Sequence, residues 1–142
     1  MVIVLLAIFA GTMVFPLKAF PTYYGNFLNY YGLSGESWML LKQPENYGAV
    51  KFLESHKDGK NLVEAVGDSY TLLNAVSVFS GVPTIQGWRV HEWLWRGGYD
   101  SVAAREAEVK EVYQGEKIEK TSAILGKYNV GWILVGQDEK IT

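Results

Sequence analysis

The stretch from residue 87 to 98, GWRVHEWLWRGG, gathers side chains that could bind and orient a ligand. Within these positions stand three tryptophans, two arginines, one histidine and one glutamate. Guanidinium and imidazole groups bind anions, and the flat face of an indole stacks on a sugar ring. On a helix, Glu92 and Arg96 would form an ion pair, because they are four positions apart. The stretch therefore predicts an anion or sugar-phosphate site with aromatic walls, formed by Trp88, Arg89, His91, Glu92, Trp95 and Arg96.

Two other interpretations of this stretch stay open. Trp88, Trp93 and Trp95 could pack the domain against an aromatic N-terminal segment, with the charged groups left at the rim. His91 and Glu92 could bind a metal ion, but two adjacent ligands without a spaced third are a weak metal signal. We therefore expect no metal site in this chain.

A second motif, VGDSYT at residues 66–71, combines carboxylate and hydroxyl groups. A strand followed by Gly-Asp-Ser resembles the nucleophile block of GDS-type acyl hydrolases, in which the serine needs a histidine base. That family also carries a C-terminal Asp-x-x-His, which this chain lacks, and its only histidines are His56 and His91. Without a positioned base we expect Ser69 to be an ordinary hydroxyl, and Asp68 or Ser69 to cap a helix. As ligand-binding residues the motif offers Asp68, Ser69 and Thr71.

The elements that must position these motifs alternate between strands and helices. Strands are expected at 61–66, 83–87 and 130–136, and helices at 44–56, from Asp68 to about residue 80, at 101–113 and at 117–128. This order predicts an α/β fold with a small three-stranded, mostly parallel sheet and flanking helices, a Rossmann-like three-layer arrangement. Because ligands bind beyond the carboxyl ends of parallel strands, both motifs should meet at one edge of the sheet.

The N-terminal segment predicts a membrane helix. Its first fifteen residues carry no charge, and a helix continued to Phe20 reaches about 30 Å, the thickness of the hydrocarbon core. A secretory signal fits poorly because no basic residue precedes the apolar run, whereas a buried soluble helix stays open. The expected organisation is a transmembrane-type helix at 1–20 (the trimmed last span of a longer protein), an aromatic interfacial connector at 21–43 and a soluble domain at 44–142.

Composition narrows the functional classes. The chain has 142 residues, a formal net charge of −2 and no cysteine. Because its net charge is close to zero, the chain has no overall positive potential that would attract nucleic acid. Because it has no cysteine, it forms neither disulfides nor thiolate metal sites.

The sequence also resembles a known family. The segments GLSGESWM, NLVEAVGDSYTLLNAVSVFSGVPTIQGWRVHEWLWRG and SAILGKYNVGWILVG occur in this order. Together they resemble the C-terminal end of the multi-pass "YYY" membrane proteins, an uncharacterised family. ILGKYNVGWILVG is also similar to the tail domain of GT-C-type glycosyltransferases, which use polyprenyl-phosphate sugars.

The resemblance implies a C-terminal, extracytoplasmic domain of an integral membrane glycosyltransferase-like protein, contributing to substrate binding but not catalytic alone. It implies the lipid bilayer, the missing transmembrane portion and a polyprenyl-phosphate sugar as partners, without nucleic acid. No cofactor is expected in this chain, and a divalent metal stays an open possibility for the full-length protein. The alternatives are a non-catalytic membrane-tethered scaffold or interaction domain and, as a weaker candidate, a GDS-type acyl hydrolase.

Overall fold

The computed structural model describes residues 1–25, 34–115 and 117–141. Its contacts divide the chain into two compact units, Met1–Trp38 and Met39–Thr142, and each is described by itself. Residues 26–33, which belong to the expected aromatic connector, lie outside the described residues.

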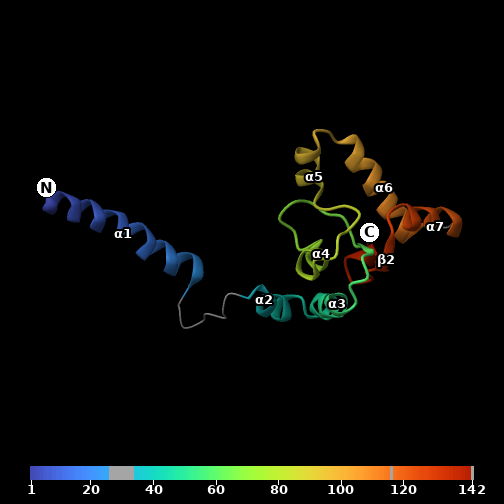
Figure 1. The fold of residues 1–142 in the computed structure, drawn as a ribbon, viewed down its shortest axis with the longest axis horizontal. Helices are drawn as coiled ribbons and strands as arrows, with labels where there is room; N and C mark the ends of the chain where they lie inside the picture. Colours follow the sequence, from blue (N-terminus) through green and yellow to red (C-terminus); the bar gives the residue numbers. More distant parts are fainter. Residues whose placement is uncertain (26–33, 116, 142) are drawn as a thin grey trace. The chain divides into compact units, whose positions relative to one another are not determined.

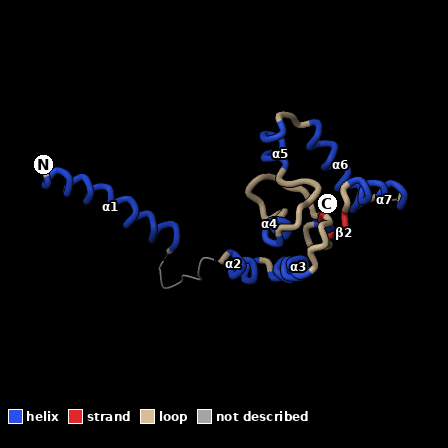
Figure 2. Tube along the Cα trace, in the orientation of Figure 1, coloured by secondary structure: helices blue, strands red, loops and turns tan. Residues whose placement is uncertain are grey.

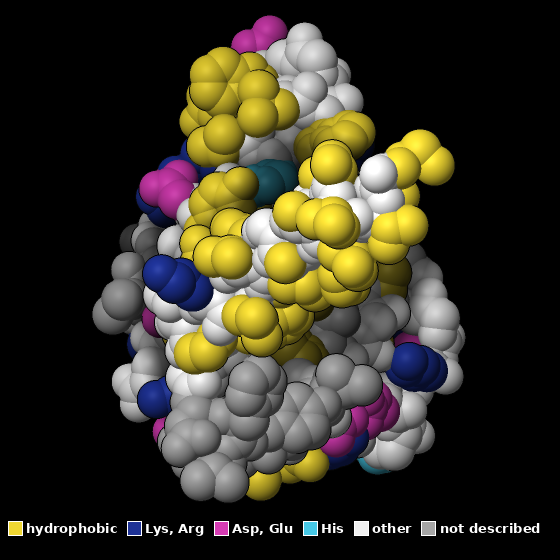
Figure 3. Space-filling model, turned by 90° about the vertical axis from the view of Figure 1, so that its left-hand side faces the viewer, with side chains coloured by type: hydrophobic (Ala, Val, Ile, Leu, Met, Phe, Trp, Pro, Cys, Tyr) yellow, Lys and Arg dark blue, Asp and Glu magenta, His cyan; other side chains and the backbone are white. Residues whose placement is uncertain are grey.

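The first unit contains the long helix α1, Val2–Tyr24 (Figure 1). Its window Val2–Tyr23 has a mean hydropathy of 2.2, and by length and composition it is the one helix among the described residues that could cross a membrane. Most hydrophobic side chains of this helix are exposed, and Figure 3 shows such side chains gathered in yellow. A signal sequence near an N-terminus has the same features, so the membrane span stays a prediction.

The second unit is mostly helical, and Figure 2 shows how little of it is strand. Around the short strands stand α3 (Pro44–Ser55), α4 (Ala75–Ser80), α5 (Arg89–Arg96), α6 (Asp100–Gln114), α7 (Ile118–Lys127) and the 3₁₀ helix η2 (Glu139–Ile141). Helix α2, Gly35–Lys42, lies within the segment 21–43 expected to be an aromatic interfacial connector. The helices expected at 44–56, 101–113 and 117–128 correspond to α3, α6 and α7.

The predicted three-stranded, Rossmann-like sheet is wrong. Within the described residues the sheet has two short parallel strands, β1 (Asn61–Val63) and β2 (Val130–Ile133). The expected third strand contributes a single bridge, Thr84 to Leu62, and the Pro83 carbonyl accepts a hydrogen bond from the Leu62 amide at 2.8 Å. Proline has no amide hydrogen to extend a ladder, and a bend at Ile85 directly follows Thr84 before α5 begins at Arg89.

The helix expected to start at Asp68 begins only at Ala75. Between them Tyr70 and Asn74 adopt left-handed backbone angles, with φ of 64° and 65°, and such residues interrupt a right-handed helix. The N-cap is Asn74, so the expectation that Asp68 or Ser69 caps this helix is wrong. Residues 67–74 instead form a loop, called the GDS loop below.

Strand β1 separates two hydrophobic clusters. Successive side chains of a strand point to opposite faces, and accordingly Leu62 packs with the cluster under α3 and α4 while Val63 packs with α6. The first cluster contains Met39, Val50, Leu53, Leu62, Val76 and Val82, and the second contains Val63, Ile85 and Val109.

Directly after β1, Glu64 is buried, with 1% of its surface exposed. One carboxylate oxygen accepts a hydrogen bond from the Ser77 amide at 3.4 Å. Burial raises the pKa of Glu64 above its ordinary value of 4.5, and the nearby carboxylate of Glu139 raises it further. The charged form of Glu64 is therefore disfavoured in the folded state.

We expect Glu64→Gln to stabilise the protein at neutral and alkaline pH. An acid with a raised pKa binds more protons when folded than when unfolded, so its contribution to stability is present below pH 4.5 and is lost as pH rises through the folded pKa. The variant should melt about 4 °C or more above the wild type at pH 8 and equal to it near pH 4, as measured by circular dichroism. Glu119→Gln, exposed on α7, makes the same charge change as a control, and equal gains in both variants would contradict the argument.

Candidate functional site

A cleft of about 560 Å³ lies between α4 and α5, where the sequence predicted a ligand site. Trp88, His91, Glu92, Trp95 and Arg96 form one wall, because positions three and four apart share a helix face. The opposite wall is formed by residues of α4, of its N-cap and of the 83–87 segment: Asn74, Ser77, Val78, Thr84 and Gly87. Five of the nine predicted binding residues thus line this surface, called the α4–α5 cleft below.

The floor of the α4–α5 cleft contains hydrogen-bond acceptors without partners. Asn74 is 6% exposed, and its amide nitrogen donates to the Gln86 carbonyl at 3.2 Å, but its Oδ1 has no hydrogen-bond partner. Thr84 Oγ1 also lacks a hydrogen-bond partner. The same is true of Glu64 Oε1 and Gln86 Oε1, which belong to residues outside the cleft lining. Buried acceptors are costly when unpaired, and these atoms are closed to solvent, so a hydrogen-bond donor in the cleft would reach Asn74 Oδ1 or Thr84 Oγ1 only after a side-chain rotation. Nothing in the spacing of these residues in the sequence marked them.

The rim of the α4–α5 cleft is balanced in charge. Arg96 Nε donates to Glu92 Oε2, the ion pair expected from their spacing, and this bond raises the pKa of Arg96. The other oxygen of Glu92 accepts the Gly87 amide at 3.4 Å. The charges of Glu92 and Arg96 offset each other at the rim, which weakens its attraction for a phosphate.

Arg89, the second predicted phosphate ligand, lies outside the cleft lining and is already paired. Its Nε and Nη2 donate to the two carboxylate oxygens of Glu106 at 2.8 and 2.5 Å, and its Nη1 donates to Asp68 Oδ1 at 2.7 Å. Hydrogen bonding to Glu106 raises the pKa of Arg89, and the same bonds lower the pKa of Glu106. Arg89 and Asp68 therefore join the GDS loop, α5 and α6. Sequence reasoning missed Glu106, which looked like one of many exposed charges of a helix.

Ser69 lies against His91. The distance from Ser69 Oγ to His91 Nδ1 is 2.6 Å, a normal hydrogen-bond length between hydroxyl and imidazole. The His91 ring also meets the rings of Tyr70 edge-on at 5.3 Å and Trp88 at 5.4 Å. Sequence reasoning assigned no base to Ser69, whereas the GDS loop folds back onto α5 and places His91, 22 positions further along the chain, beside its hydroxyl.

Thr71 and Trp88 have local structural roles. Thr71 Oγ1 donates to the Asp68 carbonyl at 2.8 Å and closes a turn of the GDS loop, away from the cleft lining. Trp88 lines the cleft while its indole nitrogen donates to the Leu73 carbonyl at 2.9 Å. Trp95, by contrast, is 86% exposed.

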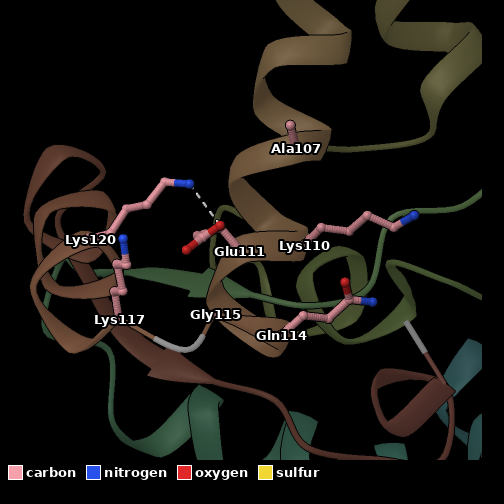
Figure 4. Close-up of a pocket in the computed structure, with 7 residues that line it drawn as sticks. All are labelled: Ala107, Lys110, Glu111, Gln114, Gly115, Lys117 and Lys120. Carbon is pink, nitrogen blue, oxygen red and sulfur yellow. Dashed lines mark hydrogen bonds and ion pairs between the residues drawn. The ribbon is translucent and has the colours of Figure 1, made fainter.

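A second cavity, of about 540 Å³, lies between α6 and α7 (Figure 4). Lys110, Lys117 and Lys120 surround it, and Lys120 donates to Glu111 at 2.8 Å. None of the unpartnered buried acceptors lies in this cavity, so it is a weaker candidate than the α4–α5 cleft. In the part of the chain that the structure describes, no group of three His, Cys, Asp or Glu could hold a metal.

A scan against protein-family models, a search of curated proteins and a search of solved structures each find no match to this chain. The resemblance to YYY and GT-C membrane proteins therefore stays a prediction.

We expect the Arg89 fork to contribute substantially to stability. Arg89→Lys keeps the charge but loses the paired hydrogen bonds to Glu106 and should lower the free energy of unfolding by about 1.5–3 kcal/mol, the range for hydrogen bonds to charged groups. Denaturant unfolding followed by tryptophan fluorescence measures this. Lys51→Ala, which removes the surface pair with Glu54, is the control and should cost less than about 1 kcal/mol.

The same fork predicts acid sensitivity. Glu106 has a lowered pKa when folded, so its contribution is present above its ordinary value of 4.5 and is lost as pH falls through the folded pKa. The stability advantage of the wild type over Glu106→Gln should therefore shrink below pH 4.5. If the difference in unfolding free energy between the wild type and Glu106→Gln did not change with pH, the charge of Glu106 would contribute nothing to stability.

Proposed function

We propose that this chain is the membrane-tethered C-terminal domain of a glycosyltransferase-like membrane protein, and that the α4–α5 cleft binds the sugar portion of its substrate. The single observation that carries the binding site is the cleft itself, with unpartnered acceptors in its floor and the exposed ring of Trp95 in its wall. The glycosyltransferase context comes from the sequence resemblance alone.

The hydrogen-bonding groups of the α4–α5 cleft support a sugar as the ligand. Sugar hydroxyls both donate and accept hydrogen bonds, and Asn74 Oδ1 and Thr84 Oγ1 are unpartnered atoms that would accept from them once a side-chain rotation opens them to the cleft. The apolar face of a sugar ring stacks on an indole such as that of Trp95. A phosphate only accepts hydrogen bonds, and both arginines that the sequence suggested for it are held by carboxylates. In this proposal the phosphate of a polyprenyl-phosphate sugar is bound outside this chain.

The apolar helix α1 supports membrane attachment, with the cleft-bearing unit on the extracytoplasmic face as the resemblance implies. The unit would contribute binding surface to a site completed by the transmembrane portion of the parent protein. Catalytic acidic residues of GT-C enzymes lie in N-terminal loops, so glycosyl transfer by this chain alone is not part of the proposal.

A scaffold or interaction domain is the second candidate, and a separate surface of α5 favours it. Val90, Trp93 and Leu94 lie on a face of this helix outside the cleft and are 37%, 46% and 70% exposed. Apolar helix faces of this kind mark contacts with other proteins or with membranes. A protein that acted only through this face would leave the cleft without a ligand.

Titration with sugars separates the two candidates. The full chain should be kept in a detergent without a sugar headgroup, since maltosides would compete. Glucose, mannose and N-acetylglucosamine, with their 1-phosphates, are added while tryptophan fluorescence is recorded. We expect saturable binding of at least one sugar, with its phosphate no tighter, and about tenfold weaker binding after Trp95→Ala or Thr84→Val.

Thr84→Val is the sharpest variant. The hydroxyl it removes has no partner in the fold, so the change should leave the melting temperature equal or higher while weakening the sugar. Trp93→Ala, on the same helix but outside the cleft, is the matched control and should bind normally. No saturable signal with any of these sugars would contradict the proposal and favour the scaffold.

A further inference from the structure

The contact between Ser69 and His91 has the geometry of a nucleophile and its base. Their 2.6 Å separation falls in the range found for serine–histidine pairs in covalent catalysis. With the ring proton on Nε2, Nδ1 accepts the hydrogen bond from the Ser69 hydroxyl. An imidazole so placed can take the hydroxyl proton when the oxygen attacks a substrate.

The surroundings hold this pair in place from both sides. The Gly67 carbonyl accepts the Arg89 amide at 3.0 Å, and a Cβ at position 67 would stand 2.0 Å from Leu73 Cδ1. The next residue after Ser69, Tyr70, has a φ of 64°, a left-handed conformation that costs energy for a side chain of this size. The backbone around Ser69 is therefore fixed against α5 in a strained turn.

The imidazole of His91 is oriented by aromatic rings. Tyr70 meets it edge-on, with an interplanar angle of 79°, and the Trp88 ring packs on it at 60°. The nearest carboxylates in sequence, Asp68 and Glu92, are held by arginines. The arrangement is a dyad without a carboxylate, and its reactivity should be lower than that of a full triad.

We propose that Ser69 is an acyl-accepting nucleophile with His91 as its general base, and that it acts on carboxylic esters. His91 also lines the α4–α5 cleft, so the alcohol part of the ester would lie there. A polyhydroxylated alcohol, as in an O-acylated sugar, fits the acceptors of that cleft. This assignment of the alcohol rests on the proposed function, whereas the assignment of the nucleophile does not.

The reaction balances with water as the second reactant. Ser69 Oγ forms a bond to the ester carbonyl carbon while its proton passes to His91 Nδ1. The bond between that carbon and the alkoxy oxygen then breaks, and the departing oxygen takes the proton from His91. Water attacks the acyl-serine with His91 as base, and its attack releases the acid and returns the proton to Ser69. The sum is ester and water converted to acid and alcohol.

A fluorophosphonate probe tests the hydroxyl directly. It forms a phosphorus–oxygen bond with an activated serine and loses fluoride. We expect the full chain to gain one adduct on Ser69, with the rate falling about 100-fold in His91→Gln, as for loss of a general base. Ser101→Ala, which removes a hydroxyl exposed on α6, should not change the labelling. No adduct on Ser69, or an equal rate in His91→Gln, would overturn the proposal.

A cysteine variant keeps the test decisive if His91→Gln fails to fold. The chain has no cysteine, so Ser69→Cys and the matched Ser101→Cys each carry a single thiol. Iodoacetamide at pH 7 should alkylate Ser69→Cys at least about tenfold faster, because a thiol beside a base is ionised more readily. Equal rates would overturn the proposal. Neither experiment depends on sugar binding, so a failure here and a failure of the sugar titration can be told apart.

Discussion

The Arg89 guanidinium is the interaction on which the functional end of this domain depends. Its planar fork contacts Glu106 on α6 with two hydrogen bonds, and its remaining nitrogen contacts Asp68 in the GDS loop. The clamp adds to two hydrogen bonds that already join the loop to the start of α5, from the Arg89 amide to the Gly67 carbonyl and from the Trp88 indole to the Leu73 carbonyl. The charge that the sequence offered for ligand binding therefore serves structure, and its position allows the Ser69–His91 contact to form.

Below the clamp, polar groups occupy places that an apolar core would normally fill. Glu64 follows β1 directly and points to a region also bounded by Asn74 and Gln86, each with a buried oxygen that lacks a partner. A fold optimised for stability alone would not keep such groups. Because these groups lie next to the α4–α5 cleft, we infer that the protein keeps them for binding although they lower its stability. Active sites often show this pattern.

Helices with clear periodicity and capping could be predicted, whereas the sheet and the loop could not. The start of α3 at Pro44 and the ends of α6 and α7 could be predicted, because residues close to them in the sequence determine where a helix begins and ends. The segment 83–87 looked like a strand by composition, but Pro83 and Gly87 at its ends leave only Thr84 to bridge β1. The GDS loop looked like a helix start because no sequence rule anticipates two non-glycine residues with positive φ. The cleft wall was predictable from helical spacing, and its floor was not, because it depends on tertiary contacts.

The mixture of indoles and charges in residues 87–98 follows from the different demands on the faces of α5. One face, with His91 and Trp95, lines the cleft. Arg89 projects toward α6 and forms the clamp, which requires a charge that is paired and partly covered. Trp93 and Leu94 remain exposed on a further face. An eight-residue helix that must bind, anchor and present an apolar surface cannot be uniformly apolar or uniformly charged. Packing of the tryptophans against the aromatic N-terminal segment and ligand binding by the cleft face both stay predictions.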